Sequence, residues 1–189
     1  MPVVEPIPPD QAPLLARAFY GDGDPGPITA TLAHVPELLE VALPFIGTAL
    51  SASSVPLRTK EIVILRTSCV MACRYCIDSH TPVALDSGLT PAQVRALRNE
   101  AGHDLAAAFD DPRDRALIRW TDEVAGGRGP VSDEATVAVT NAFAPHEVVE
   151  LTLLVGTTLL LNRYATALRL PVGDETVHRL AVAGFARAA

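Results

Sequence analysis

The sequence contains only three cysteines, no dense tract of basic residues and no long uninterrupted apolar run. Its 22 acidic residues outnumber 15 basic ones, giving a net charge of −7. This balance argues against nucleic-acid binding, which depends on cationic contacts to phosphate. The most apolar run, LTLLVGTTLLL at 151–161, has 11 residues. A membrane-spanning helix needs ~20 predominantly apolar residues, so we expect a buried helix there and no membrane partner.

The first residues, MPVVEPIPPDQAP, lack both the basic start and the apolar stretch of a signal peptide. The number of cysteines is odd, so a framework of paired disulfides is not indicated. These features together predict a cytoplasmic protein. In that compartment a C-x-x-C pair more often serves redox or metal chemistry than structural cross-linking.

Strand-like alternation between hairpin turns is absent, and the turn and capping residues indicate one all-α domain of about eight helices. Thr90 before Pro91, and Asp111 before Pro112, have the pattern of a helix N-cap followed by proline at the first helical position. Further helices are expected over Pro9–Tyr20, over Ile28–Leu50 with a kink or division at Pro36 and Pro44, from Ser132, over Pro145–Leu170, and after a cap at Asp174.

All three cysteines fall in one segment, EIVILRTSCVMACRYCIDSH at 61–80, with the spacing C-x3-C-x2-C-x3-H. On an unbroken helix, steps of four, three and four residues would keep Cys69, Cys73, Cys76 and His80 on one face. Packing in the core explains Cys69, which lies among apolar residues. It does not explain the Cys73–Cys76 pair, whose neighbours in the sequence are largely polar.

Three chemical explanations for the pair remain. A zinc site is disfavoured, because a helix from Cys69 to His80 rises ~16 Å while zinc needs every ligand within ~2.0–2.3 Å. An iron–sulfur cluster matches the cysteine spacing, but the helical context and the missing glycine-rich loop disfavour it. A redox dithiol explains the most residues, because a C-x-x-C pair near a helix start favours a thiolate and a histidine one turn later can exchange a proton with it.

Glu61, Cys73, Tyr75, Cys76 and His80 form the pattern E-x11-C-x-Y-C-x3-H. This pattern resembles the alkylhydroperoxidase D-like (AhpD-like) branch of the carboxymuconolactone decarboxylase superfamily. The segments on either side of this pattern, and residues 159–171 near the end of the chain, also resemble segments of this family. The resemblance therefore covers roughly residues 30–172. It implies an all-α AhpD-like domain over 30–172, with an N-terminal extension and short helix at 1–29 and a C-terminal helix at 173–189.

The resemblance implies a homo-oligomeric thiol-dependent peroxidase with an antioxidant role, acting on a hydroperoxide substrate and recycled by an external thiol reductant, without metal or other cofactor. Cys76 would attack the hydroperoxide, Cys73 would close the disulfide and face the reductant, and His80 and Glu61 would relay protons. The family's founding peroxidases have histidine where this chain has Tyr75, which leaves the substrate's identity open.

One geometric condition follows. On a single helix Glu61 and Cys73 would lie ~18 Å apart along the axis, so the chain must turn between about Ser68 and Arg74 for the two to share a site. No glycine or proline marks that turn. We also expect Asn162 and Arg163 to be buried polar groups that need partners.

Other functions compete with the peroxidase. A dithiol–disulfide oxidoreductase and an oligomeric redox sensor would both use the same cysteine pair without appreciable peroxidase turnover. A decarboxylase or lactone-processing enzyme gives the cysteines no task.

Overall fold

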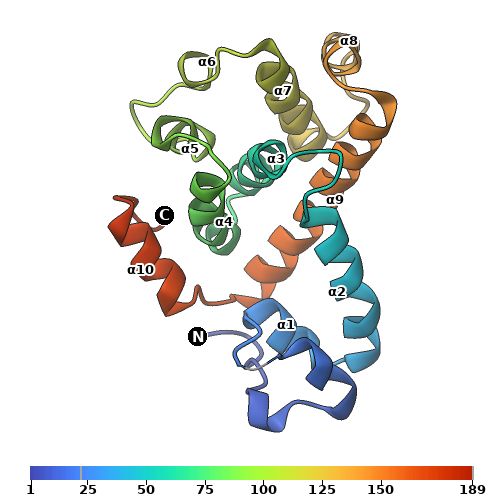
Figure 1. Ribbon diagram of the computed structural model, residues 1–189, viewed down its shortest axis with the longest axis vertical. Coiled ribbons are helices and arrows are strands. Elements are labelled where there is room, and N and C mark those ends of the chain that lie inside the picture. Colours follow the sequence, from blue (N-terminus) through green and yellow to red (C-terminus); the bar gives the residue numbers. More distant parts are fainter. Residues whose placement is uncertain (22, 189) are drawn as a thin grey trace.

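The computed structural model describes residues 1–21 and 23–188, and these residues form helices without any strand (Figure 1). Eight helices have seven or more residues, which confirms the predicted all-α architecture. The elements are η1 (Pro9–Gln11), η2 (Leu14–Phe19), α1 (Pro27–Leu32), α2 (Pro36–Leu50), α3 (Leu57–Val70), α4 (Arg74–Asp86), α5 (Pro91–Leu97), α6 (Leu105–Ala108), α7 (Pro112–Gly126), α8 (Asp133–Ala142), α9 (Pro145–Leu168) and α10 (Asp174–Val182).

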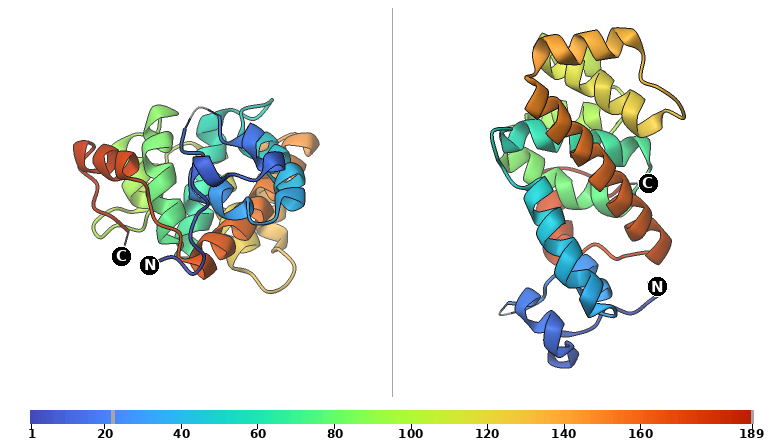
Figure 2. Two further views of the ribbon diagram at one scale, coloured as in Figure 1. Left: turned by 90° about the horizontal axis from the view of Figure 1, so that it is seen from below. Right: turned by 90° about the vertical axis from the view of Figure 1, so that its right-hand side faces the viewer.

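Helix α3 lies at the centre of the molecule, where it packs against α4, α7 and α9 (Figure 1). Its residues Ile62–Leu65 are almost completely buried, so the helix is apolar on all sides over this turn. The main core forms around them from α4, α5, α7, α8 and α9. The N-terminal segment forms a second, smaller cluster with α2, and in the right-hand view of Figure 2 it lies at the opposite end of the molecule from α7 and α8. The helix that holds the candidate glutamate is therefore fixed on every side.

Several helix starts occur where the sequence predicted them. Thr90 caps α5 in a complete capping box with Gln93, and Pro91 is the first helical residue. The side chains of Asp111 and Ser132 accept hydrogen bonds from the backbones of α7 and α8. Each cap satisfies a backbone N–H that has no partner inside the helix, which explains why these starts could be located from local chemistry alone.

Four expectations about helix boundaries need correction. Residues 9–20 form two short 3-10 segments, because Pro13 interrupts them. The chain divides at Pro36, which begins α2, as expected, whereas Pro44 does not divide the helix and lies inside it. Helix α9 ends at Leu168 because Arg169 adopts a left-handed backbone conformation, and α10 is capped by Gly173, with Asp174 as its first residue.

Helix α9 is long and apolar enough to cross a membrane by length and composition alone. In the structure it packs against α2, α3, α4, α7 and α8. Its buried residues, which include Leu151, Leu154 and Val155, belong to the main core. The apolar run at 151–161 is therefore part of a core helix, as the sequence predicted.

Candidate active site

The chain turns sharply between α3 and α4, as the sequence analysis required. Helix α3 ends at Val70 and α4 begins at Arg74. Ala72 has a φ of 51°, in the left-handed region, and the N–H of Cys73 donates to the carbonyl of Ser68 at 3.0 Å. This closure resembles the turn that usually places glycine after a helix. Alanine occupies the position here, which is why no glycine or proline announced the turn.

The turn makes Cys73 the N-cap residue of α4. Its Sγ atom accepts a hydrogen bond from the backbone N–H of Cys76 at 3.4 Å and lies 2.9 Å from the Sγ atom of Cys76. Both cysteines are free thiols, and they are 0% and 5% exposed. They are thus more deeply buried than their polar sequence neighbours suggested, in a small cluster with Ala165 and Leu170. The geometry is that of a closely paired dithiol at a helix start.

The two sulfur atoms differ in their affinity for a proton. The hydrogen bond from Cys76 is the largest influence that lowers the pKa of Cys73, to about 6, and backbone N–H groups of Cys76 and Tyr75 and the hydroxyl of Thr166 act in the same direction. The same hydrogen bond to Cys73, together with burial, raises the pKa of Cys76. At neutral pH the pair therefore carries one negative charge on Cys73, with the Cys76 thiol donating to it.

Glu61 and His80 face each other across the packed helices α3 and α4. Nδ1 of His80 lies 3.2 Å and 3.1 Å from the two carboxylate oxygens of Glu61. Glu61 is only 2% exposed, although the residue before it is the charged Lys60. His80 follows Cys76 by one helical turn on α4. Within the described residues no hydrogen bond links the two pairs directly, so Glu61–His80 and Cys73–Cys76 are two adjacent units.

Helix α9 contributes two polar groups to the dithiol. Asn162 is 1% exposed, donates from Nδ2 to the hydroxyl of Ser68 at 3.1 Å, and also acts to lower the pKa of Cys76. Its Oδ1 atom has no hydrogen-bond partner among the described residues. Thr166, one helical turn later, acts on Cys73. Asn162 is buried, as the sequence predicted, whereas Arg163, which was also expected to be buried, is exposed. The sequence analysis did not predict Thr166, although it follows Asn162 by four residues and therefore lies on the same face of the helix.

Cys69 lies apart from the dithiol, because the turn breaks the helical face that would have held all three cysteines. It is partly exposed and lines a different cavity with Arg98 and Ala186. Burial raises the pKa of its thiol. Among residues 1–21 and 23–188, no three His, Cys, Asp or Glu side chains are grouped as metal ligands.

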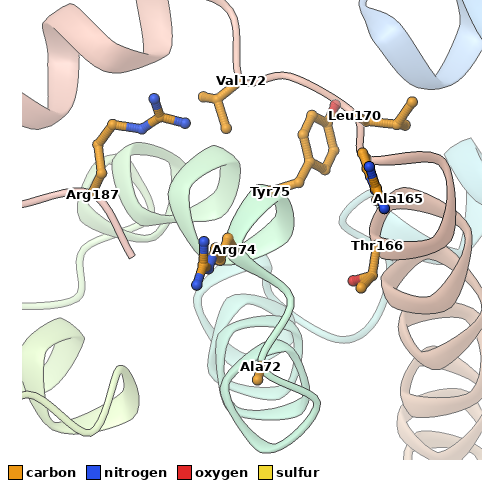
Figure 3. A pocket seen from close by; sticks show the side chains of 9 residues that line it. Ala72, Arg74, Tyr75, Ala165, Thr166, Leu170, Val172 and Arg187 are labelled. Atoms are coloured by element: carbon orange, nitrogen blue, oxygen red, sulfur yellow. The ribbon is translucent and has the colours of Figure 1, made fainter. Parts of the chain in front are cut away.

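A cavity of about 360 Å³ adjoins the dithiol (Figure 3). Its wall includes the first residues of α4, the end of α9 and the C-terminal segment: Ala72, Arg74, Tyr75, Ala165, Thr166, Arg169, Leu170, Val172 and Arg187. Ala165 and Leu170 belong both to this wall and to the apolar cluster around Cys73 and Cys76. The wall also includes Ala72 and Arg74, the two chain neighbours of Cys73, although neither cysteine lines the cavity itself.

The helical fold is that of AhpD-like proteins. An uncharacterised peroxidase-related protein with an AhpD core from Ralstonia eutropha superposes with a TM-score of 0.74 at 18% identity, over 92% of this chain and 96% of its own. A peroxidase-related protein from Silicibacter sp. gives 0.74 at 15% identity, over 93% and 91%. A debrominase, solved as a complex with 2,3,4-tribromopyrrole, gives 0.74 at 16% identity, over 95% and 96%.

The segment that carries the dithiol also matches a family model. Residues 36–123 match the carboxymuconolactone decarboxylase family, and they include α3, α4 and the turn between them. The chain is thus similar to this family over its central helices, and its structural neighbours are AhpD-like. No protein of curated function matches the sequence significantly.

Proposed function

We propose that this chain is a thiol-dependent peroxidase that reduces hydroperoxides with the Cys73–Cys76 dithiol. The main support for this proposal is the distance of 2.9 Å between the Sγ atoms of two free cysteines, one with a lowered pKa and one with a raised pKa. Such a pair holds one thiolate at neutral pH and can close to a disulfide with little movement. Two of the structural neighbours are described as peroxidase-related proteins, which agrees with this proposal.

The proposed reaction begins at Cys76. Its thiol proton passes along the shared hydrogen bond to Cys73, and the Cys76 sulfur attacks the terminal oxygen of the hydroperoxide. A sulfur–oxygen bond forms, the O–O bond breaks, and the alkoxide leaves as an alcohol with the proton that His80 relays from Cys73, which is again a thiolate. Cys76 is now a sulfenic acid. Two electrons have moved from sulfur to the peroxide.

Cys73 completes the oxidative half of the cycle. Because its pKa is lowered to about 6, it is already a thiolate when the sulfenic acid forms. The thiolate attacks the Cys76 sulfur, a disulfide forms, and hydroxide leaves and is protonated to water. An external thiol then restores the dithiol, and we propose that this occurs in the cytoplasm, where reducing thiols are abundant.

The Glu61–His80 pair serves the proton transfers. Nδ1 of His80 is directed at the buried carboxylate, which leaves the Nε2 atom of the ring for exchange with the dithiol. A carboxylate at this position stabilises the charged imidazole formed when His80 takes a proton from the dithiol. Glu61 is therefore a positioning residue that acts through His80.

The test is a titration of free thiols before and after one equivalent of cumene hydroperoxide. The wild-type protein should lose two thiols per chain, and Cys76→Ser should abolish this loss. A Cys73→Ser variant should instead accumulate a sulfenic acid that dimedone traps. Wild-type protein that retains its thiols with cumene hydroperoxide, yet is oxidised to the Cys73–Cys76 disulfide by an external disulfide, would replace the peroxidase by the dithiol oxidoreductase or redox sensor.

We also propose that the chain assembles with copies of itself. Leu38, Val41 and Phe45 form an exposed apolar stripe along α2, at helical spacing. A second stripe, Val149, Leu153 and Leu160, lies exposed on α9, which packs against α2. Exposed apolar stripes on two packed helices support this proposal, because contact with another copy would bury them. Light scattering should give a mass above that of one chain, and Val41→Glu should reduce it; a monomeric wild type would contradict the proposal.

A further inference from the structure

The cavity beside the dithiol is rich in positive charge. Three of the residues that line it are Arg74, Arg169 and Arg187, which come from the start of α4, the end of α9 and the C-terminal segment. Figure 3 shows the side chains of Arg74 and Arg187 on one side and Thr166 and Leu170 on the other, with Tyr75 between them. The positive end of the α4 dipole lies at the same place. Three parts of the chain thus bring cations to one hollow.

Most of this charge is not neutralised by the protein. Nε of Arg187 lies 3.4 Å from Oδ2 of the buried Asp78, so one guanidinium is paired. Within the described residues neither Arg74 nor Arg169 takes part in an ion pair. The other acidic group that acts nearby is Asp24, whose charge contributes to raising the pKa of Tyr75. The described arginines of the cavity therefore retain an excess of positive charge.

The backbone at the cavity is held in an unfavourable conformation at two points. Ala72 and Arg169 both have left-handed φ values, of 51° and 53°. Glycine is the usual residue at such a position, because a Cβ atom makes the conformation costly. At the end of α9, an arginine is present instead and its side chain lines the cavity. Strain of this kind is typical of functional sites.

The cavity reaches the dithiol through shared residues. Tyr75 and Thr166 line it, and a backbone N–H of Tyr75 and the hydroxyl of Thr166 both lower the pKa of Cys73. A ligand held by the arginines would therefore lie against the residues that cover Cys73, whose side chain is itself 0% exposed. About 360 Å³ accommodates a small organic molecule but not a protein segment of any length.

We propose that this cavity binds the carboxylate of a small reactant of the dithiol. The inference rests on the proposed redox role of Cys73 and Cys76, and the reactant is either the thiol reductant or the hydroperoxide. For a thiol, its thiolate attacks the Cys73–Cys76 disulfide, the S–S bond breaks, and the released sulfur takes a proton. A second thiol then attacks the mixed disulfide, which yields the external disulfide and the reduced pair.

The reductive half is tested on protein whose disulfide has been formed with diamide, so that it does not depend on peroxidase activity. We compare the rates of reduction by 3-mercaptopropionate and by its methyl ester, which differ in charge. The rate with the carboxylate divided by the rate with the ester should fall about tenfold in the double variant Arg74→Gln/Arg169→Gln. The reason is that the carboxylate loses its charge-assisted hydrogen bonds at a partly exposed site. Arg119→Gln, which removes an exposed guanidinium on α7, should keep the wild-type ratio.

The oxidative half is tested on the reduced protein with cumene hydroperoxide carrying a para-carboxylate and with the methyl ester of that compound. If the double variant lowers the ratio of carboxylate rate to ester rate in this oxidative half, the cavity binds the hydroperoxide. If it lowers the ratio in the reductive half, the cavity binds the reductant. The inference is overturned when the double variant keeps the wild-type ratio in both halves, or when Arg119→Gln lowers it equally. Failure of the dithiol to react with neutral cumene hydroperoxide instead counts against the proposed peroxidase and leaves the reductive comparison valid.

Discussion

Nδ1 of His80 lies 3.1 Å from a carboxylate oxygen of Glu61, although the two residues are 19 positions apart and belong to different helices. The contact exists because α3 ends before the cysteine pair and α4 returns beside it. Glu61 is buried and His80 is partly exposed, so the pair connects the interior to the surface of the domain. It is the structural basis of the proposed proton relay.

Replacing Glu61 by glutamine should slow oxidation of the dithiol by cumene hydroperoxide. Glutamine has nearly the same shape but cannot stabilise a charged imidazole, so we expect the rate of thiol loss to fall about 100-fold. Stopped-flow measurement of thiol loss checks this. Glu134→Gln removes an exposed carboxylate of α8 and should leave the rate unchanged. A wild-type rate in Glu61→Gln would remove Glu61 from the site.

The thiolate of Cys73 should titrate with a midpoint near pH 6, seen as thiolate absorbance in the ultraviolet. The hydrogen bond from Cys76 is the main cause, so Cys76→Ala should raise the pKa of Cys73, whereas Cys76→Ser keeps a donor and should raise it less. A midpoint unchanged by Cys76→Ala would contradict the shared hydrogen bond.

The same titration should affect folding stability. Because the folded-state pKa of Cys73 is lowered, its contribution is present near pH 9 and is lost as the pH falls through about 6. Over this window the free energy of unfolding of the wild type should rise with pH relative to Cys73→Ser. Urea denaturation at a series of pH values measures the difference, and parallel curves for the two proteins would contradict it.

Lys60 should be essential for stability and not for chemistry. It is 0% exposed, and its Nζ atom lies 2.9 Å from the carbonyl of Ala49, 2.5 Å from that of Ser51 and 2.6 Å from Oε1 of Glu150. Lys60→Met should lower the free energy of unfolding by about 3–5 kcal/mol, because it leaves a carboxylate and two carbonyls without their cation. Urea denaturation gives the value. A loss as small as that of an exposed ion pair, about 0–1 kcal/mol, would show that the cluster is not rigid.

Ala72→Gly should stabilise the protein. Its left-handed conformation costs an alanine about 1–2 kcal/mol, while the added freedom of glycine in the unfolded chain costs about 0.4–1 kcal/mol, so a small net gain is expected. Ala181→Gly, at an exposed position inside α10, should instead destabilise by about 1 kcal/mol. Thermal unfolding of both variants shows whether each substitution stabilises or destabilises the protein. If both variants are less stable than the wild type, the backbone at Ala72 is not strained.

Features set by local chemistry were predictable from the sequence. Thr90 and Asp111 cap helices because hydroxyl and carboxylate oxygens accept backbone hydrogen bonds wherever the following residues are helical. The turn after Val70 was predicted from a different argument, that Glu61 had to approach the dithiol. The sequence contains no local signal for it, because alanine rarely adopts the left-handed conformation.

Features set by tertiary packing could not be predicted. Adjacent charged residues such as Lys60 and Glu61 usually lie in solvent, yet both are buried, because the end of α2 offers carbonyl groups and α4 offers His80. Arg74, Arg169 and Arg187 are far apart in the sequence and meet only because α9 ends beside the start of α4. The negative charge on Cys73 likewise depends on its capping position, which the motif alone does not specify.

The N-cap of α4 is itself a reactive atom, and this links helix integrity to oxidation state. In the dithiol, the charged sulfur of Cys73 accepts the backbone N–H of Cys76 at the positive end of the helix. A disulfide sulfur has no charge and is a poor acceptor, so closing the bond weakens that anchor. The opening turn of α4 should therefore fray and re-form with each cycle, and amide hydrogen exchange at Cys76 would report it directly.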